Sequence, residues 1–324
     1  MTKAIRFHKP GGPEVLQWDD VSVGEPGEGQ ARVKHTAVGV NFIDTYQRSG
    51  LYQLPLPSGL GGEGAGVVEA VGKGVTHIKP GDRVCYAGGP PGSYSQVRNM
   101  PADRLLKIPD GISDQQGAAM MLKGMTTQYL IRRTYKVQKG DTVLFHAAAG
   151  GVGLIACQWL KALGATVIGT VGSDEKAKLA KAHGADHVIN YSTEDFVKRV
   201  KEITNGKGVP VVYDSVGKST FMGSLDCLRP FGLLACFGQS SGPIGPVDLG
   251  ILAAKGSLYV TRPTLVTYTA SRADLEMTAN ELFDVVKSGK VKIEINHTYP
   301  LKDAQQVHRD LEGRKTTGSI VMQP

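Results

Sequence analysis

The segment that most constrains the fold runs from Thr142 to Leu163, where an apolar strand, a turn of small residues and an amphipathic helix follow one another. The turn is Ala147-Ala148-Ala149-Gly150-Gly151-Val152-Gly153. Small residues let a ligand approach the backbone, and the free N–H groups and dipole at the start of a helix attract anions. This order of strand, turn and helix therefore predicts an anion-binding turn after a buried parallel strand.

The chain from Asp141 onward alternates short apolar runs with helical stretches, which is the pattern of a parallel α/β sheet. The predicted strands cover residues 142–146, 166–171, 187–190, 209–213, 232–237 and 258–261. The predicted helices between them cover residues 152–163, 174–183, 194–204 and about 219–228. Ser192 or Thr193 is the expected N-cap of the third helix. Because six strands complete a doubly wound sheet, we expect the sheet to end there.

The first 110 residues follow a different pattern, with Pro and Gly turn pairs at close intervals between short alternating strands. We predict a mainly β domain for this region. A helix is expected to open at Ser113, with Gln116 as its capping-box partner, and to bridge the two domains through Thr134.

The last 60 or so residues are assigned to the first domain, because the doubly wound sheet is already complete. Their predicted elements are a helix from Arg272 to Lys287, capped by Ser271 and stopped by Gly289, and two short strands around Ile293 and Ile320. The expected domains are residues 1–124 with 264–324, and residues 125–263.

The glycine-rich turn is a variant of the dinucleotide fingerprint G-x-G-x-x-G, in which Ala148 occupies the first glycine position. Its position in a β-α-β-α sequence favours a Rossmann-type dinucleotide site over a turn that only connects two elements. The residues expected to hold the pyrophosphate are Ala149, Gly150, Gly151, Val152 and Gly153.

The second predicted strand ends in Val171-Gly172-Ser173, without the Asp or Glu that binds the ribose hydroxyls of NAD. Ser173 can donate a hydrogen bond to a 2′-phosphate, and Lys176 and Lys178 follow in the next helix. NADPH is therefore favoured over NADH. The alternative is that both lysines are simply solvated, and the neighbouring Asp174-Glu175 pair weakens the preference.

Composition limits the other classes of function. The net charge of +7 is a modest excess for 324 residues, so nucleic-acid binding is a weaker alternative. No apolar run approaches the roughly 20 residues of a membrane span, and the N-terminal residues lack the apolar core of a signal peptide. The four cysteines are scattered and form no C-x-x-C pair, which favours a reducing cytoplasm over a disulfide framework or a structural zinc lobe.

The motifs resemble those of the quinone oxidoreductase and ζ-crystallin family, a branch of the medium-chain dehydrogenases and reductases. The resemblance is carried by Gly140–Leu144, Ala148–Gly153, Gln158 and Lys161, and by the segments Gly39–Asp44, Gly61–Gly66 and Pro80–Val84. It implies a GroES-like catalytic domain, a Rossmann domain for NADPH, and a homodimer.

The same resemblance predicts an enzyme without a metal. Zinc alcohol dehydrogenases have a Cys at or next to Asn41, a His at Gly62 and a Cys near Leu122, and here all three positions are apolar or amide. A catalytic zinc needs about three Cys, His or carboxylate ligands. Without such a Lewis acid an alcohol is hard to ionise, so an electrophilic acceptor such as a quinone is the expected substrate.

The resemblance places Asn41, Asp44, Tyr46 and Tyr52 around the substrate. Asn41 and Tyr46 are expected to orient the nicotinamide carboxamide or to hydrogen-bond a quinone oxygen, and Tyr52 to stack or to donate a proton. The alternative is that both tyrosines are packing residues and that Asn41 only satisfies local backbone groups.

The resemblance also implies further cofactor contacts, most of them after successive strands of the second domain. These are Thr127, Tyr191, Ser215, Phe237, Gly238, Gln239, Ser240, Thr261, Arg262, Pro263 and Arg314. Arg314 is expected at the adenosine phosphate, although Ser319 departs from the Gly-Lys pair common in the family.

The function expected from the sequence is NADPH-dependent reduction of a quinone. Reduction of an activated alkene such as a 2-alkenal or enone is an alternative that uses the same hydride geometry. An alternative of another class is an NADPH-binding structural or RNA-binding protein. The eight histidines form no metal-binding or catalytic spacing, so surface or structural roles are expected for them.

Overall fold

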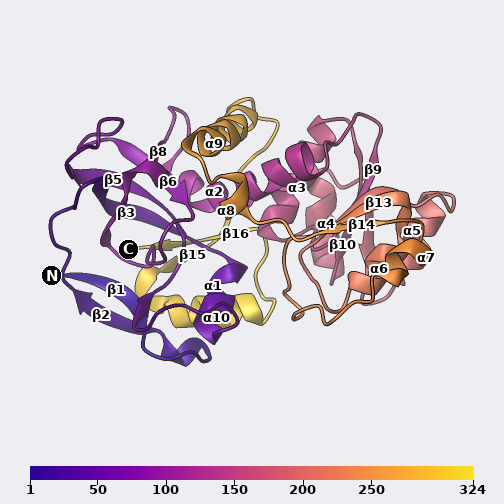
Figure 1. Ribbon diagram of the computed structural model, residues 1–324, viewed down its shortest axis with the longest axis horizontal. Helices are drawn as coiled ribbons and strands as arrows, with labels where there is room; N and C mark the ends of the chain where they lie inside the picture. Colours follow the sequence, from indigo (N-terminus) through magenta and orange to yellow (C-terminus); the bar gives the residue numbers. More distant parts are fainter. The chain divides into compact units, whose positions relative to one another are not determined.

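A computed structural model describes residues 1–324, and the chain divides into two compact units (Figure 1). Unit 1 consists of Met1–Met125, Thr269–Phe283 and Ile293–Pro324. Unit 2 consists of Thr126–Tyr268 and Asp284–Lys292. None of the helices has the length and apolar character needed to span a membrane.

Unit 2 is built on a six-stranded parallel sheet with the order β11-β10-β9-β12-β13-β14. The strands are β9 (Thr142–Phe145), β10 (Thr166–Val171), β11 (His187–Asn190), β12 (Val209–Asp214), β13 (Leu228–Cys236) and β14 (Tyr259–Thr261). Strand order reverses between β9 and β12, and ligands of doubly wound sheets bind at such a reversal. The predicted doubly wound sheet is confirmed.

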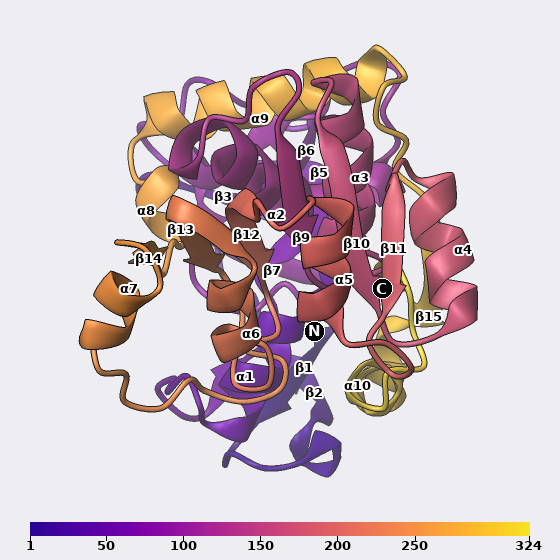
Figure 2. The ribbon, with the colours of Figure 1, turned by 90° about the vertical axis from the view of Figure 1, so that its right-hand side faces the viewer.

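Helices cover both faces of this sheet. The helix α3 (Gly151–Ala162) packs against α4 (Asp174–Ala182), while α5 (Phe196–Ile203) packs against α6 (Phe221–Asp226). Figure 2 shows the strands side by side, with α5 and α6 in front of them. Two short helices, α7 (Gly250–Ala254) and α8 (Leu265–Tyr268), lie in the segments before and after β14.

Two of the predicted helix boundaries in unit 2 are wrong. The third helix begins at Phe196 rather than Glu194, because the Asp195 carboxylate accepts the N–H groups of the first turn. The two residues predicted as N-caps form other hydrogen bonds instead. The Ser192 hydroxyl donates to the Gly172 carbonyl, and the Thr193 hydroxyl donates to the Asn190 carbonyl. The fourth helix is shorter than residues 219–228, because the chain enters β13 at Leu228 and pairs there with β12.

Unit 1 is mainly β, as predicted. One sheet has the order β15-β16-β3-β5-β6-β8, with β7 paired to β3, and a smaller one has the order β2-β1-β4. The strands are β1 (Thr2–Phe7), β2 (Gln17–Val21), β3 (Gln30–Val40), β4 (Ser58–Gly59), β5 (Glu63–Val71), β6 (Arg83–Ala87), β7 (Val97–Pro101), β8 (Leu106–Lys107), β15 (Ile295–Pro300) and β16 (Ser319–Gln323).

Two predicted helices have the expected caps. The helix α2 (Asp114–Tyr129) starts after Ser113, whose hydroxyl and N–H bond reciprocally with Gln116, and it continues as a π-helix to Thr134. The helix α9 (Arg272–Lys287) starts after Ser271 and is followed by Gly289 in the left-handed region, at φ 74°.

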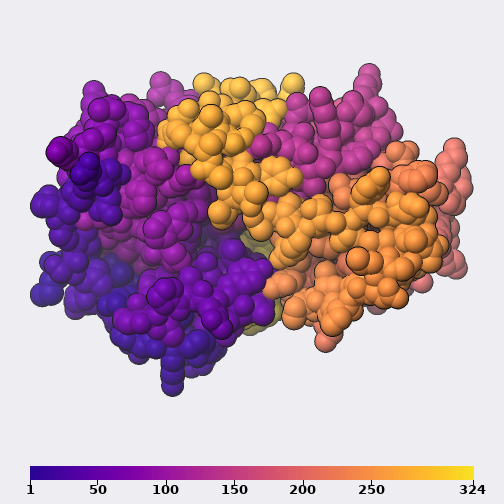
Figure 3. Space-filling view, viewed as in Figure 1, coloured from indigo at the N-terminus to yellow at the C-terminus, as the bar shows by residue number.

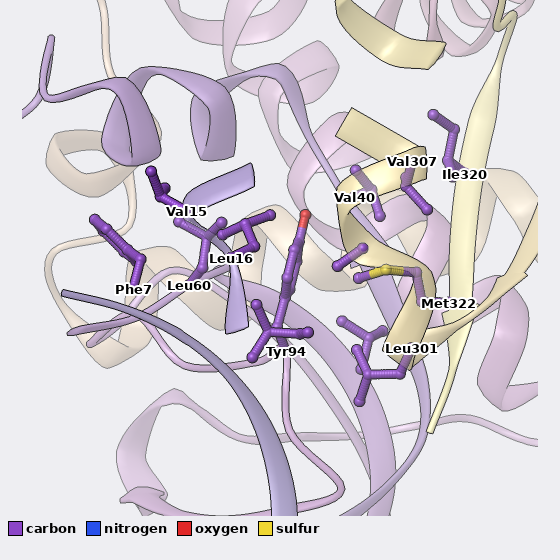
Figure 4. Packing of buried hydrophobic residues seen from close by; sticks show 13 residues of the cluster. Phe7, Val15, Leu16, Val40, Leu60, Tyr94, Leu301, Val307, Ile320 and Met322 are labelled. Atoms are coloured by element: carbon purple, nitrogen blue, oxygen red, sulfur yellow. The ribbon is translucent and has the colours of Figure 1, made fainter. Parts of the chain in front are cut away.

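The sequence did not predict two helices of unit 1, α1 (Phe42–Ser49) and α10 (Ala304–Glu312). Both are short and amphipathic, and they pack against each other. The helix α10 contributes Ala304 and Val307 to a core that also contains Tyr94, Leu60 and Met322. Figure 4 shows the Tyr94 ring surrounded by apolar side chains of this core. The hydroxyl oxygen is the only polar atom of the buried Tyr94 side chain.

Candidate functional site

The four residues that were predicted to surround the substrate lie in helix α1 or next to it: Asp44 and Tyr46 are in the helix, Asn41 precedes it and Tyr52 follows it. Asn41 is its N-cap residue, in the extended conformation, and Asp44 follows in the first turn. The Asp44 carboxylate accepts the Asn41 backbone N–H at 2.9 Å, which satisfies one orphan donor of the helix. The structure therefore brings Asn41 and Asp44 together as one capping unit.

The Asn41 side chain is held by a buried carboxylate. Its Nδ2 donates to Glu63 Oε2 at 2.7 Å, and Glu63 is fully buried at the start of β5. Glu63 also accepts the Leu122 N–H at 2.7 Å and lies 3.2 Å from Lys123 Nζ. These contacts fix the Asn41 amide in one orientation, with Nδ2 toward Glu63. Sequence reasoning did not single out Glu63, although a carboxylate between glycines at the start of an apolar strand was a usable signal.

The two predicted tyrosines form an aromatic pair. The ring centroids of Tyr46 and Tyr52 are 5.4 Å apart in an edge-on arrangement, and Phe42 lies 5.5 Å from Tyr46 on the other side. The Tyr52 N–H donates to the Tyr46 carbonyl at 3.0 Å, which fixes the loop after α1 against the helix. Both tyrosines are half-buried, so each has a packed side and an accessible side.

Asp44 has an unusual environment for a carboxylate. It is fully buried, and its Oδ2 accepts hydrogen bonds from the Asn41 N–H and from the Tyr94 hydroxyl, each at 2.9 Å. Its Oδ1 is buried without a hydrogen-bond partner. Burial raises the pKa of Asp44 from 3.8 to about 7, against the opposing effect of the two donors on Oδ2. Asp44 therefore titrates near neutral pH.

A chain of hydrogen bonds extends from Asp44 to helix α10. His308 Nε2 lies 3.2 Å from the Tyr94 hydroxyl, and His308 Nδ1 lies 3.0 Å from Arg48 Nη1. Arg48 in turn forms a bidentate ion pair with Glu312, with N–O distances of 2.7 and 2.8 Å. Sequence reasoning missed His308, Arg48 and Tyr94, because no local spacing links residues that meet only after folding.

The direction of this chain follows from Arg48. Since an arginine can only donate, His308 Nδ1 is an acceptor and neutral His308 carries its proton on Nε2. Burial, and then the charge of Arg48, lower the pKa of His308 to about 3, which keeps the ring neutral. His308 therefore donates to Tyr94, and Tyr94 donates to Asp44.

In unit 2, the glycine-rich turn has the geometry of an anion site. Gly150 is the N-cap of α3 and offers no side-chain cap. The Leu154 N–H is the first that bonds back, to the Gly150 carbonyl at 2.9 Å, so the N–H groups of Gly151, Val152 and Gly153 have no acceptor inside the helix. The pyrophosphate of a dinucleotide would supply the acceptors that this turn lacks.

The turn is also too tight for a larger residue at its end. A Cβ on Gly153 would lie 2.4 Å from the Ala147 carbonyl oxygen and 2.7 Å from Ala148. Ala147 itself is in the left-handed region, at φ 55°. The predicted role of Gly153, close packing of helix on strand, agrees with this geometry.

The residues predicted to recognise the 2′-phosphate lie together at the start of α4. Ser173 is the N-cap, and its hydroxyl accepts the Lys176 N–H at 3.3 Å. The backbone N–H of Glu175, and then the Ser173 hydroxyl, lower the pKa of the Glu175 carboxyl. The Asp174 carboxylate is engaged elsewhere, because it accepts a hydrogen bond from the Asn190 side-chain amide at 2.9 Å. Glu175 and a phosphate would therefore compete for Ser173, while the exposed Lys178 supplies positive charge beside them.

The remaining predicted cofactor residues of unit 2 mostly follow the carboxyl ends of its strands. Tyr191 follows β11, and its hydroxyl would lie 2.7 Å from a Cβ on Gly172. Ser215 follows β12 and accepts the Ser240 N–H at 3.1 Å, which joins the loop after β12 to the one after β13. That second loop is Phe237-Gly238-Gln239-Ser240, and Thr261, Arg262 and Pro263 stand at the end of β14.

Two predicted cofactor residues lie elsewhere in the chain. Thr127 is fully buried within α2. Arg314 is an exposed residue of unit 1 just after α10, in the left-handed region at φ 59°. Their roles stay predictions.

Two protein families match this chain, each over a different part of it. Residues 27–110 match the family described as alcohol dehydrogenase GroES-like domain, and residues 151–280 match zinc-binding dehydrogenase. The chain is 57% identical to the quinone oxidoreductase of Pseudomonas aeruginosa and 49% identical to a 2-haloacrylate reductase of a Burkholderia species, in both cases over its whole length and at least 99% of theirs. It also matches the crystal structure of Escherichia coli quinone oxidoreductase complexed with NADPH, with a TM-score of 0.98, 55% identity, and coverage of 99% of this chain and 100% of that one.

At the positions where zinc alcohol dehydrogenases have their zinc ligands, the residues of this chain do not fit a zinc ion. Gly62 and Leu122 have no ligating side chain, and Nδ2 of Asn41 is a donor toward Glu63. Elsewhere in the chain, no three His, Cys, Asp or Glu side chains are grouped to hold a metal.

The identity extends over the whole chain, and the domain matches and the turn at Gly150 agree with it. The chain belongs to the quinone oxidoreductase family of the medium-chain dehydrogenases and reductases.

Proposed function

We propose that this protein is an NADPH-dependent quinone oxidoreductase that transfers reducing equivalents from NADPH to a quinone. The observation that carries the proposal is the uncapped start of α3 at Gly150, together with the absence of a carboxylate at the end of β10. Relatives named quinone oxidoreductase, one of them crystallised with NADPH, support it. We assign substrate binding to residues 1–124 and 264–324, and cofactor binding to residues 125–263.

The nicotinamide of bound NADPH supplies the hydride, and the protein binds and orients the reactants. Asn41 keeps its second amide hydrogen for a substrate oxygen, because the first is used by Glu63. Tyr46 and Tyr52 offer an aromatic surface to a flat acceptor. These contacts would hold a quinone in position, which is the main requirement for an acceptor that is already electrophilic.

The test of this function is a screen of NADPH oxidation with 1,4-benzoquinone, 9,10-phenanthrenequinone, an α,β-unsaturated aldehyde and 2-chloroacrylate. We expect turnover with at least one quinone. Oxidation of NADPH with the alkenes alone would instead establish the second candidate, reduction of an activated alkene, which the 49% identity to a 2-haloacrylate reductase favours. Tight RNA binding at physiological salt with no turnover of any acceptor would favour a binding protein.

The cofactor preference is expected to depend on the start of α4. We expect NADPH to bind about tenfold or more tightly than NADH, because a charged phosphate contact contributes roughly 1.5 to 3 kcal/mol. Replacing Lys178 with alanine should weaken NADPH binding and leave NADH binding unchanged. The control is Lys181→Ala, in the last turn of the same helix. Fluorescence titration gives the dissociation constants, and equal values for the two cofactors would contradict the preference.

We also propose that the protein is a homodimer joined along β14. This strand is the edge of its sheet, and Tyr259 and Val260 on it are 62% and 40% exposed. In Figure 3, residues of unit 2 from the region of α7 and β14, coloured orange, are exposed on the viewed face. Exposed apolar edge strands readily pair with another copy. Light scattering should give twice the chain mass for the native protein and the single mass for Val260→Glu.

The four cysteines are all free and buried, and burial raises the pKa of each thiol. We propose that the protein works in the cytoplasm, where such thiols stay reduced.

A further inference from the structure

A buried polar network lies beneath the carboxyl edge of the sheet in unit 2. Its centre is Asp214, the last residue of β12, which is fully buried. Its Oδ1 accepts the N–H groups of Val216 and Gly217 at 2.7 and 3.0 Å. Its Oδ2 accepts the hydroxyls of Thr220 and Ser224 at 2.7 and 2.9 Å. Four donors fill the acceptor sites of one carboxylate.

The network continues from Ser224 to the other strands. Ser224 Oγ lies 3.0 Å from His146 Nε2, and His146 Nδ1 lies 2.8 Å from Thr170 Oγ1. Because Ser224 gives its only proton to Asp214, His146 must donate through Nε2 and accept at Nδ1. Burial lowers the pKa of His146, which agrees with a neutral ring. The donors therefore follow one direction, from Thr170 through His146 and Ser224 to Asp214.

These residues stand directly before the loops that are proposed to hold the cofactor. His146 precedes the glycine-rich turn, Thr170 lies in the last part of β10 before Ser173, and Asp214 precedes Ser215. The loop after β12 also holds the loop after β13: Ser241 donates to the Val216 carbonyl through both its N–H and its hydroxyl, at 2.9 and 2.7 Å. One set of buried hydrogen bonds thus connects the starts of three of these loops and extends to a fourth.

The shape of the loop after β12 leaves it little freedom once Asp214 is fixed. Gly217 is in the left-handed region at φ 86°, and a Cβ there would lie 3.0 Å from Gln239 Cα. A Cβ on Gly238 would lie 2.6 Å from the Ser215 carbonyl oxygen. The two loops are therefore packed backbone against backbone, and a displacement of Asp214 would move both.

We propose that Ser224 and His146 are positioning residues for the dinucleotide: acting through Asp214, they hold the turn Ser215–Gly217 in the conformation that receives it. The inference rests on the proposed function, since it takes these loops as the cofactor site. Neither side chain reaches the surface, as His146 is 1% and Ser224 0% exposed, so neither is a catalytic residue. The chemistry recognised is that of a nicotinamide dinucleotide.

The decisive variant is Ser224→Ala, which removes one hydroxyl and so separates His146 from Asp214. We expect the dissociation constant for NADPH to rise about fivefold, the effect of losing roughly one hydrogen bond's contribution. We also expect faster hydrogen exchange at the amides of Val216 and Gly217, measured without cofactor. Ser224→Thr, which keeps the hydroxyl, should restore both values toward those of the native protein.

The matched control is Cys227→Ala, one turn further along and also fully buried. It removes a small side chain from the same region without touching the network, so it should lower thermal stability and leave both readouts unchanged. If Ser224→Ala changes only the melting temperature, as the control does, the residue is merely structural and the inference is overturned. Should the native protein bind no NADPH, the proposed function fails and the positioning role for a dinucleotide fails with it. The exchange rates would then still report whether Ser224 holds the turn.

Discussion

Replacing Gly153 with alanine is expected to weaken NADPH binding by at least about tenfold, or roughly 1.4 kcal/mol. The added methyl group would stand 2.4 Å from the Ala147 carbonyl oxygen and 2.7 Å from Ala148, and both contacts are with backbone. The turn cannot relax easily, because Ala147 is already in the left-handed region. The start of α3 would therefore move away from β9, and the free N–H groups of the helix would no longer converge on one pyrophosphate.

Fluorescence titration with NADPH measures this effect, and a thermal melt separates it from loss of the fold. The matched control is Gly245→Ala, because a Cβ at Gly245 has no neighbour within 4 Å. The control should bind NADPH as the native protein does. An unchanged dissociation constant for Gly153→Ala in a folded protein would show that the turn does not hold the cofactor.

The anion-binding turn of the proposed cofactor site could be predicted from the residues alone, because the determinants of its fold are local. The strand, the glycine-rich turn and the helix are consecutive, and the parallel sheet brings loops after different strands to one edge without further information. The cap of α5 shows the limit of this reasoning. Three residues before this helix have side chains suited to an N-cap: Ser192, Thr193 and Asp195. Asp195 is the N-cap, because the side chains of the other two form hydrogen bonds elsewhere.

The residues proposed around the substrate were predicted only through the resemblance, and the buried residues that contact them were not predicted. Asn41 and Asp44 lie on α1, but what fixes their chemistry is Glu63 and Tyr94. His308 joins Arg48 across 260 positions of sequence. The contact between Arg48 and His308 depends on how α1 and α10 pack, and the short length of both helices left little periodicity to detect. The general expectation that histidines have surface or structural roles gave no reason to select His308.

Replacing Asp44 with asparagine is expected to change how stability depends on pH. The folded chain holds the Asp44 proton up to a pKa of about 7, whereas the unfolded chain loses it near 3.8. Folding therefore takes up a proton between these values, so the stability contributed by Asp44 is complete below pH 3.8 and is lost as pH rises to about 7. The asparagine side chain of the variant cannot titrate. The stability of the native protein relative to Asp44→Asn should fall by roughly 2 to 3 kcal/mol between about pH 5 and pH 8.

Urea unfolding of both proteins at the two pH values measures this difference. His35 and His308, whose pKa values are lowered by burial to about 4 and about 3, also change stability in this range but with the opposite sign. Both histidines are present in both proteins, so their contributions cancel in the comparison. Tyr94, Glu63 and Lys123, the other titratable groups acting on Asp44, are also retained. A difference between the two proteins that stays constant from pH 5 to pH 8 would show that Asp44 is already a carboxylate at pH 5. A difference that falls as expected would establish Asp44 as a group that carries a proton next to Asn41 at neutral pH, where reduction of a quinone consumes one.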